Sequence, residues 1–184
     1  MATATLLTSA DFVRAHTSIS DNVDGKYITP AIREAQDIEL RSILGDRLLD
    51  RLTDLVGSGT IGNPENAAYK DLLSRAQYYL AYLTVSRLIP SVTWKVGNFG
   101  LTKTSDENLT PATDAEMDRQ VQYWTNQADA CAGRLQRWLL SNAAAFPELD
   151  ACACDTLRAN LLSMNSSGLF LGGPRGKWIG RTRR

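Results

Sequence analysis

The sequence predicts an all-α fold: a helical bundle with long central and C-terminal helices, one inserted β-hairpin or extended loop, and an extended C-terminal arm. Apolar residues recur at helical spacing through most of residues 1–145, and capping residues, prolines and glycines stand between the periodic segments. Residues 165–184 are rich in glycine and basic residues and show neither a helical nor a strand period. We therefore expect a helical domain at 1–145 and an arm at 146–184.

The first part of the chain predicts three helices. TSAD at residues 8–11 can start a short helix, because its threonine can cap the chain and its aspartate stands in the first turn. The dipeptide TP at 29–30 predicts the start of a second helix, with threonine as cap and proline at the first position, and Gly45 predicts its end. A third helix is expected over 46–56, where leucines follow helical spacing.

A central helix is predicted over 65–89. The tripeptide NPE at 63–65 combines a cap, a proline and an acid, and Pro90 is expected to stop the helix. The stretch YYLAYL at 78–83 is apolar or aromatic on almost every side of a helix. Such a helix is usually surrounded by others, so we expect it to lie at the centre of the fold.

A hairpin or extended loop at 92–112 is predicted before the last helix. Residues 92–96 alternate as in a strand, a glycine-containing turn follows, and residues 101–104 return. TDAE at 113–116 is a capping box that starts a helix reaching about residue 141. Its apolar residues form a heptad-like seam that predicts antiparallel packing on another helix. The seam consists of Met117, Val121, Trp124, Ala128, Cys131, Leu135 and Trp138.

The sequence shows no pattern typical of an enzyme, a cofactor site or a metal site. His16 is the single histidine, and no nucleophile motif or phosphate-binding loop accompanies it. The pair Cys152 and Cys154 lacks the second Cys or His pair that zinc requires. No stretch of about 18 apolar residues predicts a membrane span, and the N-terminus does not resemble a secretory signal. We expect a protein without catalytic activity that folds in a cytoplasm.

Charge is divided unevenly along the chain. Residues 1–150 hold 14 Lys and Arg against 19 Asp and Glu, whereas residues 151–184 hold six basic residues and one acid. An acidic body with a basic tail indicates interaction surfaces.

The order of these parts resembles the head–tail connector (adaptor, or head-completion) proteins of tailed bacteriophages. The resemblance covers roughly residues 5–142 and lies in four segments followed by the long last helix: LLTSADFVRAHTSISD, TPAIREAQDIELRSILGDRLLDRL, NAAYKDLLSRAQYYLAYLTVSRLIP and VTWKVGNFGLTKTSDENLTPA. It implies a virion protein, assembled in the host cytoplasm, that forms a homo-oligomeric ring, commonly of twelve copies, in the neck of the particle. Its implied partners are the portal protein, tail or second neck-ring proteins, and genomic DNA that passes through the channel without sequence-specific contact.

The resemblance also gives the unusual C-terminus a role. Twenty extended residues reach about 66–72 Å, which exceeds the roughly 40 Å width of a 150-residue domain. An arm of this length suits docking into a neighbouring subunit, with aromatic anchors and basic residues that face acidic surface or DNA. A disordered basic tail is the other interpretation of this segment. The expected interaction residues are Trp94 and Phe99 in the loop, and Phe170, Arg175, Lys177, Trp178, Arg181, Arg183 and Arg184 in the arm.

A second function remains open at this point. A nucleic-acid-binding accessory protein could use the basic terminus on phosphates, with salt-dependent and sequence-independent affinity.

Overall fold

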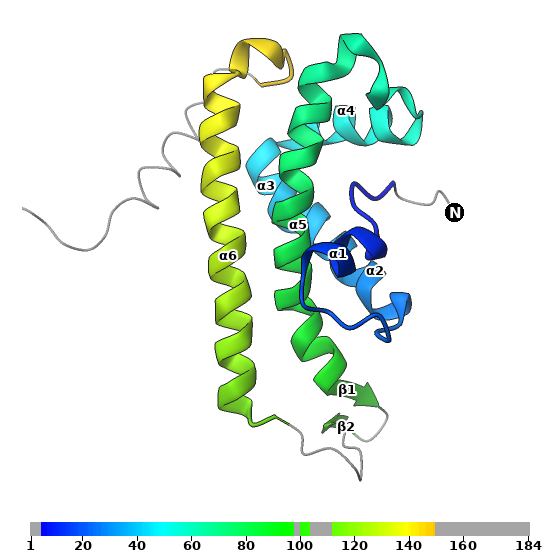
Figure 1. Ribbon diagram of the computed structural model, residues 1–184, viewed down its shortest axis with the longest axis vertical. Coiled ribbons are helices and arrows are strands. Elements are labelled where there is room, and N and C mark those ends of the chain that lie inside the picture. The colour runs from blue at the N-terminus through cyan, green and yellow to red at the C-terminus, as the bar shows by residue number, and fades with distance from the viewer. Residues whose placement is uncertain (1–4, 98–99, 104–111, 150–184) are drawn as a thin grey trace, which may run out of the picture.

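The computed structural model describes residues 5–97, 100–103 and 112–149, and their main part is helical (Figure 1). The predicted all-α class is confirmed. The α-helices are α1 (Ala10–His16), α2 (Gly25–Glu34), α3 (Arg41–Leu44), α4 (Asp46–Gly57), α5 (Ala67–Thr93) and α6 (Asp114–Ser141). Shorter turns are the π-helical η1 (Ala35–Leu40) and the 3-10 turns η2 (Thr60–Gly62), η3 (Pro64–Asn66) and η4 (Ala143–Ala145). The strands β1 (Trp94–Gly97) and β2 (Gly100–Lys103) pair antiparallel, with Trp94 opposite Lys103.

Helix α5 is the centre of the fold. It runs antiparallel to α6 along its length, and α1, α2 and η1 pack against its other sides (Figure 1). Leu72, Ala76, Leu80 and Ala81 of this helix are completely buried. The sequence prediction of a central helix is therefore confirmed.

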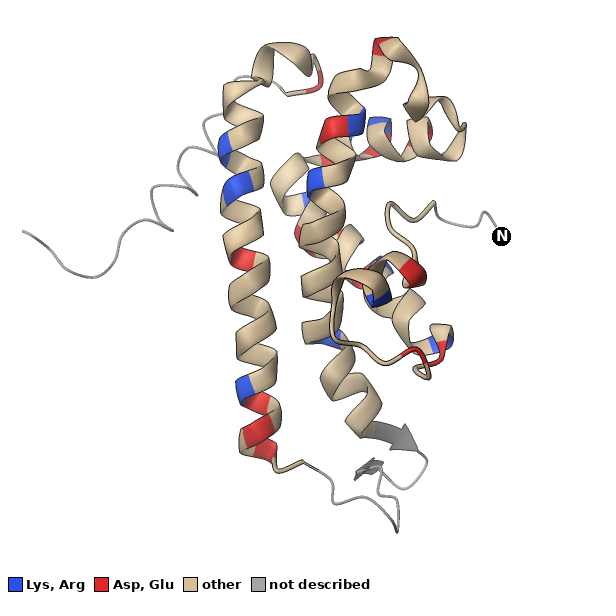
Figure 2. Cartoon of the chain, viewed as in Figure 1, with Lys and Arg blue, Asp and Glu red and all other residues tan. Residues whose placement is uncertain are grey.

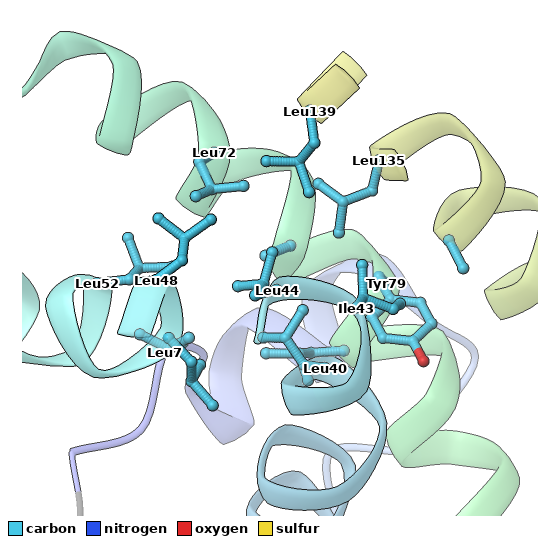
Figure 3. Close-up of a cluster of buried hydrophobic side chains, with 14 of the residues drawn as sticks. Leu7, Leu40, Ile43, Leu44, Leu48, Leu52, Leu72, Tyr79, Leu135 and Leu139 are labelled. Carbon is cyan, nitrogen blue, oxygen red and sulfur yellow. The ribbon is translucent and has the colours of Figure 1, made fainter. Parts of the chain in front are cut away.

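Two apolar clusters share α5. The larger one joins leucines of η1, α3, α4, α5 and α6, and Figure 3 shows these side chains converging around Leu44. The smaller one joins Val13 of α1 and Ile32 of α2 to Val85 and Leu88 of α5. Burial of each such side chain stabilises the fold by about 1.5–3 kcal/mol.

The second helix begins one turn earlier than the sequence analysis predicts. Asp24 caps it, because its Oδ1 accepts a hydrogen bond from the Lys26 N–H at 3.0 Å, and Pro30 lies inside the helix. The prediction of a start at 29–30 is wrong because a proline removes only one backbone donor, whereas the earlier start buries Ile28 completely. The helix continues through η1 and α3 until Gly45, whose φ of 76° ends it as predicted.

The π-helical turn η1 holds the N-terminal segment. The Gln36 side chain accepts a hydrogen bond from the Leu7 N–H at 2.9 Å and donates one to the Thr5 carbonyl at 3.1 Å. Gln77 of α5 donates to the Leu7 carbonyl at 2.9 Å. These bonds satisfy the backbone of an irregular segment whose Leu7 side chain is buried in the larger cluster.

Helix α5 also extends beyond its predicted end. It passes Pro90 and ends at Thr93, so the first strand begins at Trp94 and not at residue 92. The hydroxyls of Ser91 and Thr93 donate to the carbonyls of Arg87 and Ile89, which adds hydrogen bonds to the turn that contains the proline. A proline after several helical turns does not end a helix when the residues beyond it still have hydrogen-bond partners.

Helix α6 has the predicted capping box: Thr113 Oγ1 accepts from the Glu116 N–H at 3.3 Å, and the Glu116 carboxylate accepts from the Thr113 N–H at 2.9 Å. The hydrogen bonds that the Glu116 carboxylate accepts from the Thr113 N–H and, at 2.8 Å, from the Thr113 hydroxyl lower the pKa of this carboxyl. In the predicted seam, Ala128 and Leu135 are buried, and the other members are half-buried.

The chain folds back after α6. Phe146 is buried, and its ring contacts the rings of Tyr69 and Trp138 edge-on. The distances between ring centres are 5.3 Å to Tyr69 and 5.8 Å to Trp138. The Tyr69 hydroxyl donates to the Glu148 carboxylate at 2.9 Å. The start of the segment predicted as an arm thus packs on the bundle, and residues 150–184 lie outside the described residues.

Replacement of Leu80 by aspartate tests the central position of α5. Leu80→Asp places an unpaired carboxylate in the core, so we expect a loss of several kcal/mol in the free energy of unfolding. Urea denaturation followed by circular dichroism measures it. Ser74→Asp, on an exposed part of the same helix, is the control and should change stability little. A fully helical Leu80→Asp protein of unchanged stability would contradict the placement.

Replacement of Tyr79 by phenylalanine gives a pH-dependent prediction. Burial raises the pKa of Tyr79, and the Asp129 carboxylate adds to the effect. The unfolded chain ionises this phenol above pH about 10 while the folded chain keeps it neutral, so folding loses stability as pH rises. Compared with the wild type, Tyr79→Phe should gain about 1.4 kcal/mol per pH unit above pH 10. If the free energy of unfolding changes equally with pH in the two proteins between pH 9 and 11, Tyr79 is not buried as the structure shows, and the prediction is wrong.

Candidate interaction surfaces

A groove lies at the end of the bundle that carries β1 and β2. It has a volume of about 670 Å³ and lies between α5, the start of α6 and the segment that joins α1 to α2. Apolar side chains including Ile19, Leu88, Ile89 and Met117 line it, together with Trp124. Acidic residues gather at the start of α6 beside this groove (Figure 2). The arrangement suits an apolar partner with a basic flank.

Of the predicted interaction residues, Trp94 has a described position. It is half-buried, directly follows α5 and forms the first pair of the two strands. Phe99 in the loop lies outside the described residues, as do the predicted residues of the arm: Phe170, Arg175, Lys177, Trp178, Arg181, Arg183 and Arg184.

Aromatic side chains of α1, α5 and α6 form one surface that the sequence does not predict. We call it the aromatic face, and its two groups of contacting rings are Phe12, His16 and Tyr78, and Tyr82, Tyr123 and Trp124. They form one surface because His16 of the first group lines a pocket together with all three residues of the second. The rings of Phe12 and His16 stack with their centres 4.0 Å apart, and the rings of Tyr82 and Trp124 stack with their centres 5.9 Å apart. Tyr78 and Tyr123 remain 43% and 52% exposed, which is large for aromatic rings in a folded chain.

A hollow rimmed by arginines adjoins the aromatic face. It has a volume of about 330 Å³ and lies between α5 and α6; the lining residues are Arg75, Tyr78, Tyr82, Cys131, Arg134 and Leu135. The Arg75 guanidinium lies 4.8 Å from the centre of the Trp138 ring. Arg134 Nε donates to the Ala130 carbonyl at 3.2 Å. Both cations are therefore held in place at the rim.

Cys131 in this hollow carries a neutral thiol. Burial raises the pKa of Cys131, although the nearby Arg134 acts in the opposite direction. Its Sγ lies 3.5 Å from Arg134 Nη2. A neutral thiol in this position acts as a small apolar side chain.

The helices on another side of α5 present an acidic surface, which we define by Glu34, Asp37, Asp46, Asp50 and Asp54. Arg41 pairs with Asp46 at 2.7 Å and with Asp50 at 3.7 Å. Arg87 of α5 pairs with Glu34 at 3.6 Å and also with Glu39. Apart from the half-buried Glu39, the members of these pairs lie at the surface, and an exposed pair adds at most about 1 kcal/mol to stability.

Helical periodicity could have located part of these surfaces. Tyr78 and Tyr82 stand four residues apart on one helix and therefore share a side. Composition alone predicts that the whole stretch 78–83 is buried, because it is apolar or aromatic all round. Position on one side of α5 separates exposed Tyr78 from buried Leu80.

Within residues 5–97, 100–103 and 112–149, no three His, Cys, Asp or Glu side chains gather as a metal ion would need. None of the helices in this part of the chain combines the length and the apolar character needed to cross a membrane.

Comparison with known proteins gives one family. No curated protein and no solved structure matches the chain. A family model described as "Family of unknown function (DUF6712)" matches residues 40–158, which is more than half of the 184 residues. The matched region begins in the helix before α4 and includes α5, α6 and part of the segment after them. The chain belongs to the DUF6712 family.

Proposed function

We propose that this protein is a structural subunit, without enzymatic activity, of a ring in the neck of a tailed bacteriophage. The ring would lie between the portal and the tail, extend the DNA channel and provide a platform for tail attachment. The observation that carries the proposal is the order of elements: a short helix, a helix pair, a central helix, an inserted segment and a long last helix. This is the order on which the resemblance to head–tail connector proteins rests.

The surfaces described above support self-assembly. The groove beside β1 and β2 and the aromatic face meet at Trp124, which belongs to both, whereas the acidic surface lies on α2, η1 and α4. Apolar patches with polar rims are typical of protein interfaces. We expect a dodecameric ring whose inserted segment at 92–112 and C-terminal arm contact neighbouring subunits, the portal or a second neck ring.

The charge distribution favours one other function. Residues 151–184 carry six basic residues and one acid, so a nucleic-acid-binding accessory protein is the second candidate. This function requires no ring.

Imaging of the purified chain separates the two candidates. We expect negative-stain images to show rings with a central opening, and native mass spectrometry to give an integer multiple of the chain mass. The rings should show little affinity for DNA. A monomer that retains DNA, with affinity that falls as salt rises and is lost on deletion of residues 165–184, would contradict the ring and favour the accessory protein.

Replacement of the two aromatics of the inserted segment tests its role. We expect Trp94→Ser/Phe99→Ser to keep the melting temperature of the monomer and to reduce the fraction of assembled protein, because a two-stranded element is marginal alone and gains stability from contacts. Sedimentation velocity and thermal denaturation measure the two effects. A lower melting temperature with unchanged assembly would place these residues in the core of the subunit.

A further inference from the structure

Among the residues whose burial the structure describes, 5–94 and 112–149, Ile38 has the most exposed large apolar side chain, at 59% exposure. It lies on η1 among acids: Asp37 and Glu39 flank it, and Glu34 lies one turn earlier. Its neighbours Ala35, Gln36 and Leu40 are buried, so Ile38 projects from the side of the helix that faces away from the bundle. An isolated isoleucine at the edge of an acidic surface contributes nothing to the core that the structure describes.

The hollow between α5 and α6 is complementary to Ile38 and its acidic neighbour, because it is apolar inside and has basic residues at its rim. Leu135 and the neutral thiol of Cys131 are apolar, Tyr78 and Tyr82 add aromatic walls, and two arginines stand at the rim. At about 330 Å³ the hollow is small for a cofactor and sufficient for one apolar side chain. Tyrosine and arginine are the residues that most often dominate binding energy at protein interfaces.

Ile38 and the hollow lie on opposite sides of the subunit. Arg87 pairs with Glu34 and Glu39, which flank Ile38. Arg87 and Tyr78 are nine residues apart on α5, which separates them by about 180° around a helix with 3.6 residues per turn. A chain therefore does not fill its own hollow with Ile38, and the contact requires a second copy.

We propose that Ile38 of one copy inserts into the hollow of the next copy, where the exposed Asp37 faces Arg75 and Arg134. The occupant is thus a second copy of this chain, and the proposal rests on the self-assembly in the proposed function. The contact is head-to-tail because it joins two different surfaces of the chain. Repetition of such a contact gives a closed ring when the rotation from one copy to the next divides a full turn evenly. Opposite charges around an apolar centre fix the register of the contact.

The observations favour a protein partner over a single-stranded nucleic acid. Nucleic acid would stack bases on open aromatic faces. Here the Tyr82 ring stacks on Trp124, and the guanidinium of Arg75 covers Trp138. This leaves Tyr78 as the one open ring among the residues that line the hollow. Beside Ile38, the exposed Asp37 supplies a countercharge for the arginines at the rim, whereas Glu34 and Glu39 pair with Arg87 of their own chain.

Disulfide formation between subunits tests the contact directly. In the full chain with Cys152→Ser and Cys154→Ser, we introduce Ile38→Cys, so that the new thiol should meet Cys131 of the next copy. Mild oxidation, at alkaline pH because burial raises the pKa of Cys131, should give a ladder of linked chains on non-reducing gels. Mass spectrometry should identify the peptide pair containing positions 38 and 131. A disulfide requires Cα atoms within about 7 Å, so the link reports a specific contact.

Two controls accompany this experiment. Arg33→Cys places an exposed thiol on the same helix, five residues and about 140° away from Ile38, and should give no ladder. Cys131→Ser in the Ile38→Cys chain should abolish the ladder.

Ile38→Ser supplies a second readout that needs no oxidation. Since Ile38 is exposed, the variant should keep its unfolding curve, and we expect self-association to weaken about tenfold or more in sedimentation velocity. If the wild type forms rings, absence of the 38–131 link together with unchanged association of Ile38→Ser would overturn this contact and leave the proposed ring intact. A wild type that stays monomeric would overturn both. Loss of single-stranded DNA binding on Tyr78→Ala, without any change in association, would assign the hollow to nucleic acid and overturn the contact as well.

Discussion

The structure depends on the burial of α5 from nearly all sides. Helices α1, α2, α6 and the turn η1 contact it directly, and both apolar clusters include its side chains. Ala76 and Ala81 are completely buried on this helix, where their small size lets neighbouring helices approach closely. A helix in this position holds the N-terminal helices and α6 in one body. The groove, the hollow, the aromatic face and the acidic surface therefore all lie on α5 or on helices that pack around it.

Polar contacts complete the fold where the apolar clusters end. The side chains of Gln36 and Gln77 bind the backbone of the N-terminal segment, and Tyr69 binds Glu148 after α6. Each hydrogen bond contributes about 0.5–1.5 kcal/mol, so together they add less than a few buried leucines. Their effect is to fix both ends of the described chain on the bundle. A body fixed in this way presents the aromatic face, the hollow and the acidic surface at constant relative positions, which a repeated contact between copies requires.

Local sequence rules predicted the features that local chemistry determines. The capping box at Thr113 and the end of a helix at Gly45 follow from a few neighbouring residues. The rules failed at Pro30 because the turn before it buries Ile28. They failed at Pro90 because the hydroxyls of Ser91 and Thr93 donate hydrogen bonds to carbonyls of the preceding turn. They also could not predict contacts such as that of Tyr69 with Glu148, which are 79 residues apart. The positions of the aromatic face and the hollow depend on which sides of α5 and α6 are covered by other helices. The spacing of apolar residues along either helix does not show which sides those are.

Native-state hydrogen exchange tests the central role of α5 most directly. If all other elements depend on this helix, the backbone amides between Leu72 and Leu88 should exchange only when the whole chain unfolds. Their opening free energy should then equal the global free energy of unfolding and fall with urea at the same slope. Amides of α1, α4 and the first turns of α6 should exchange earlier, through smaller openings. Amides of α6 or of α2 that stay protected after those of α5 have exchanged would contradict the account.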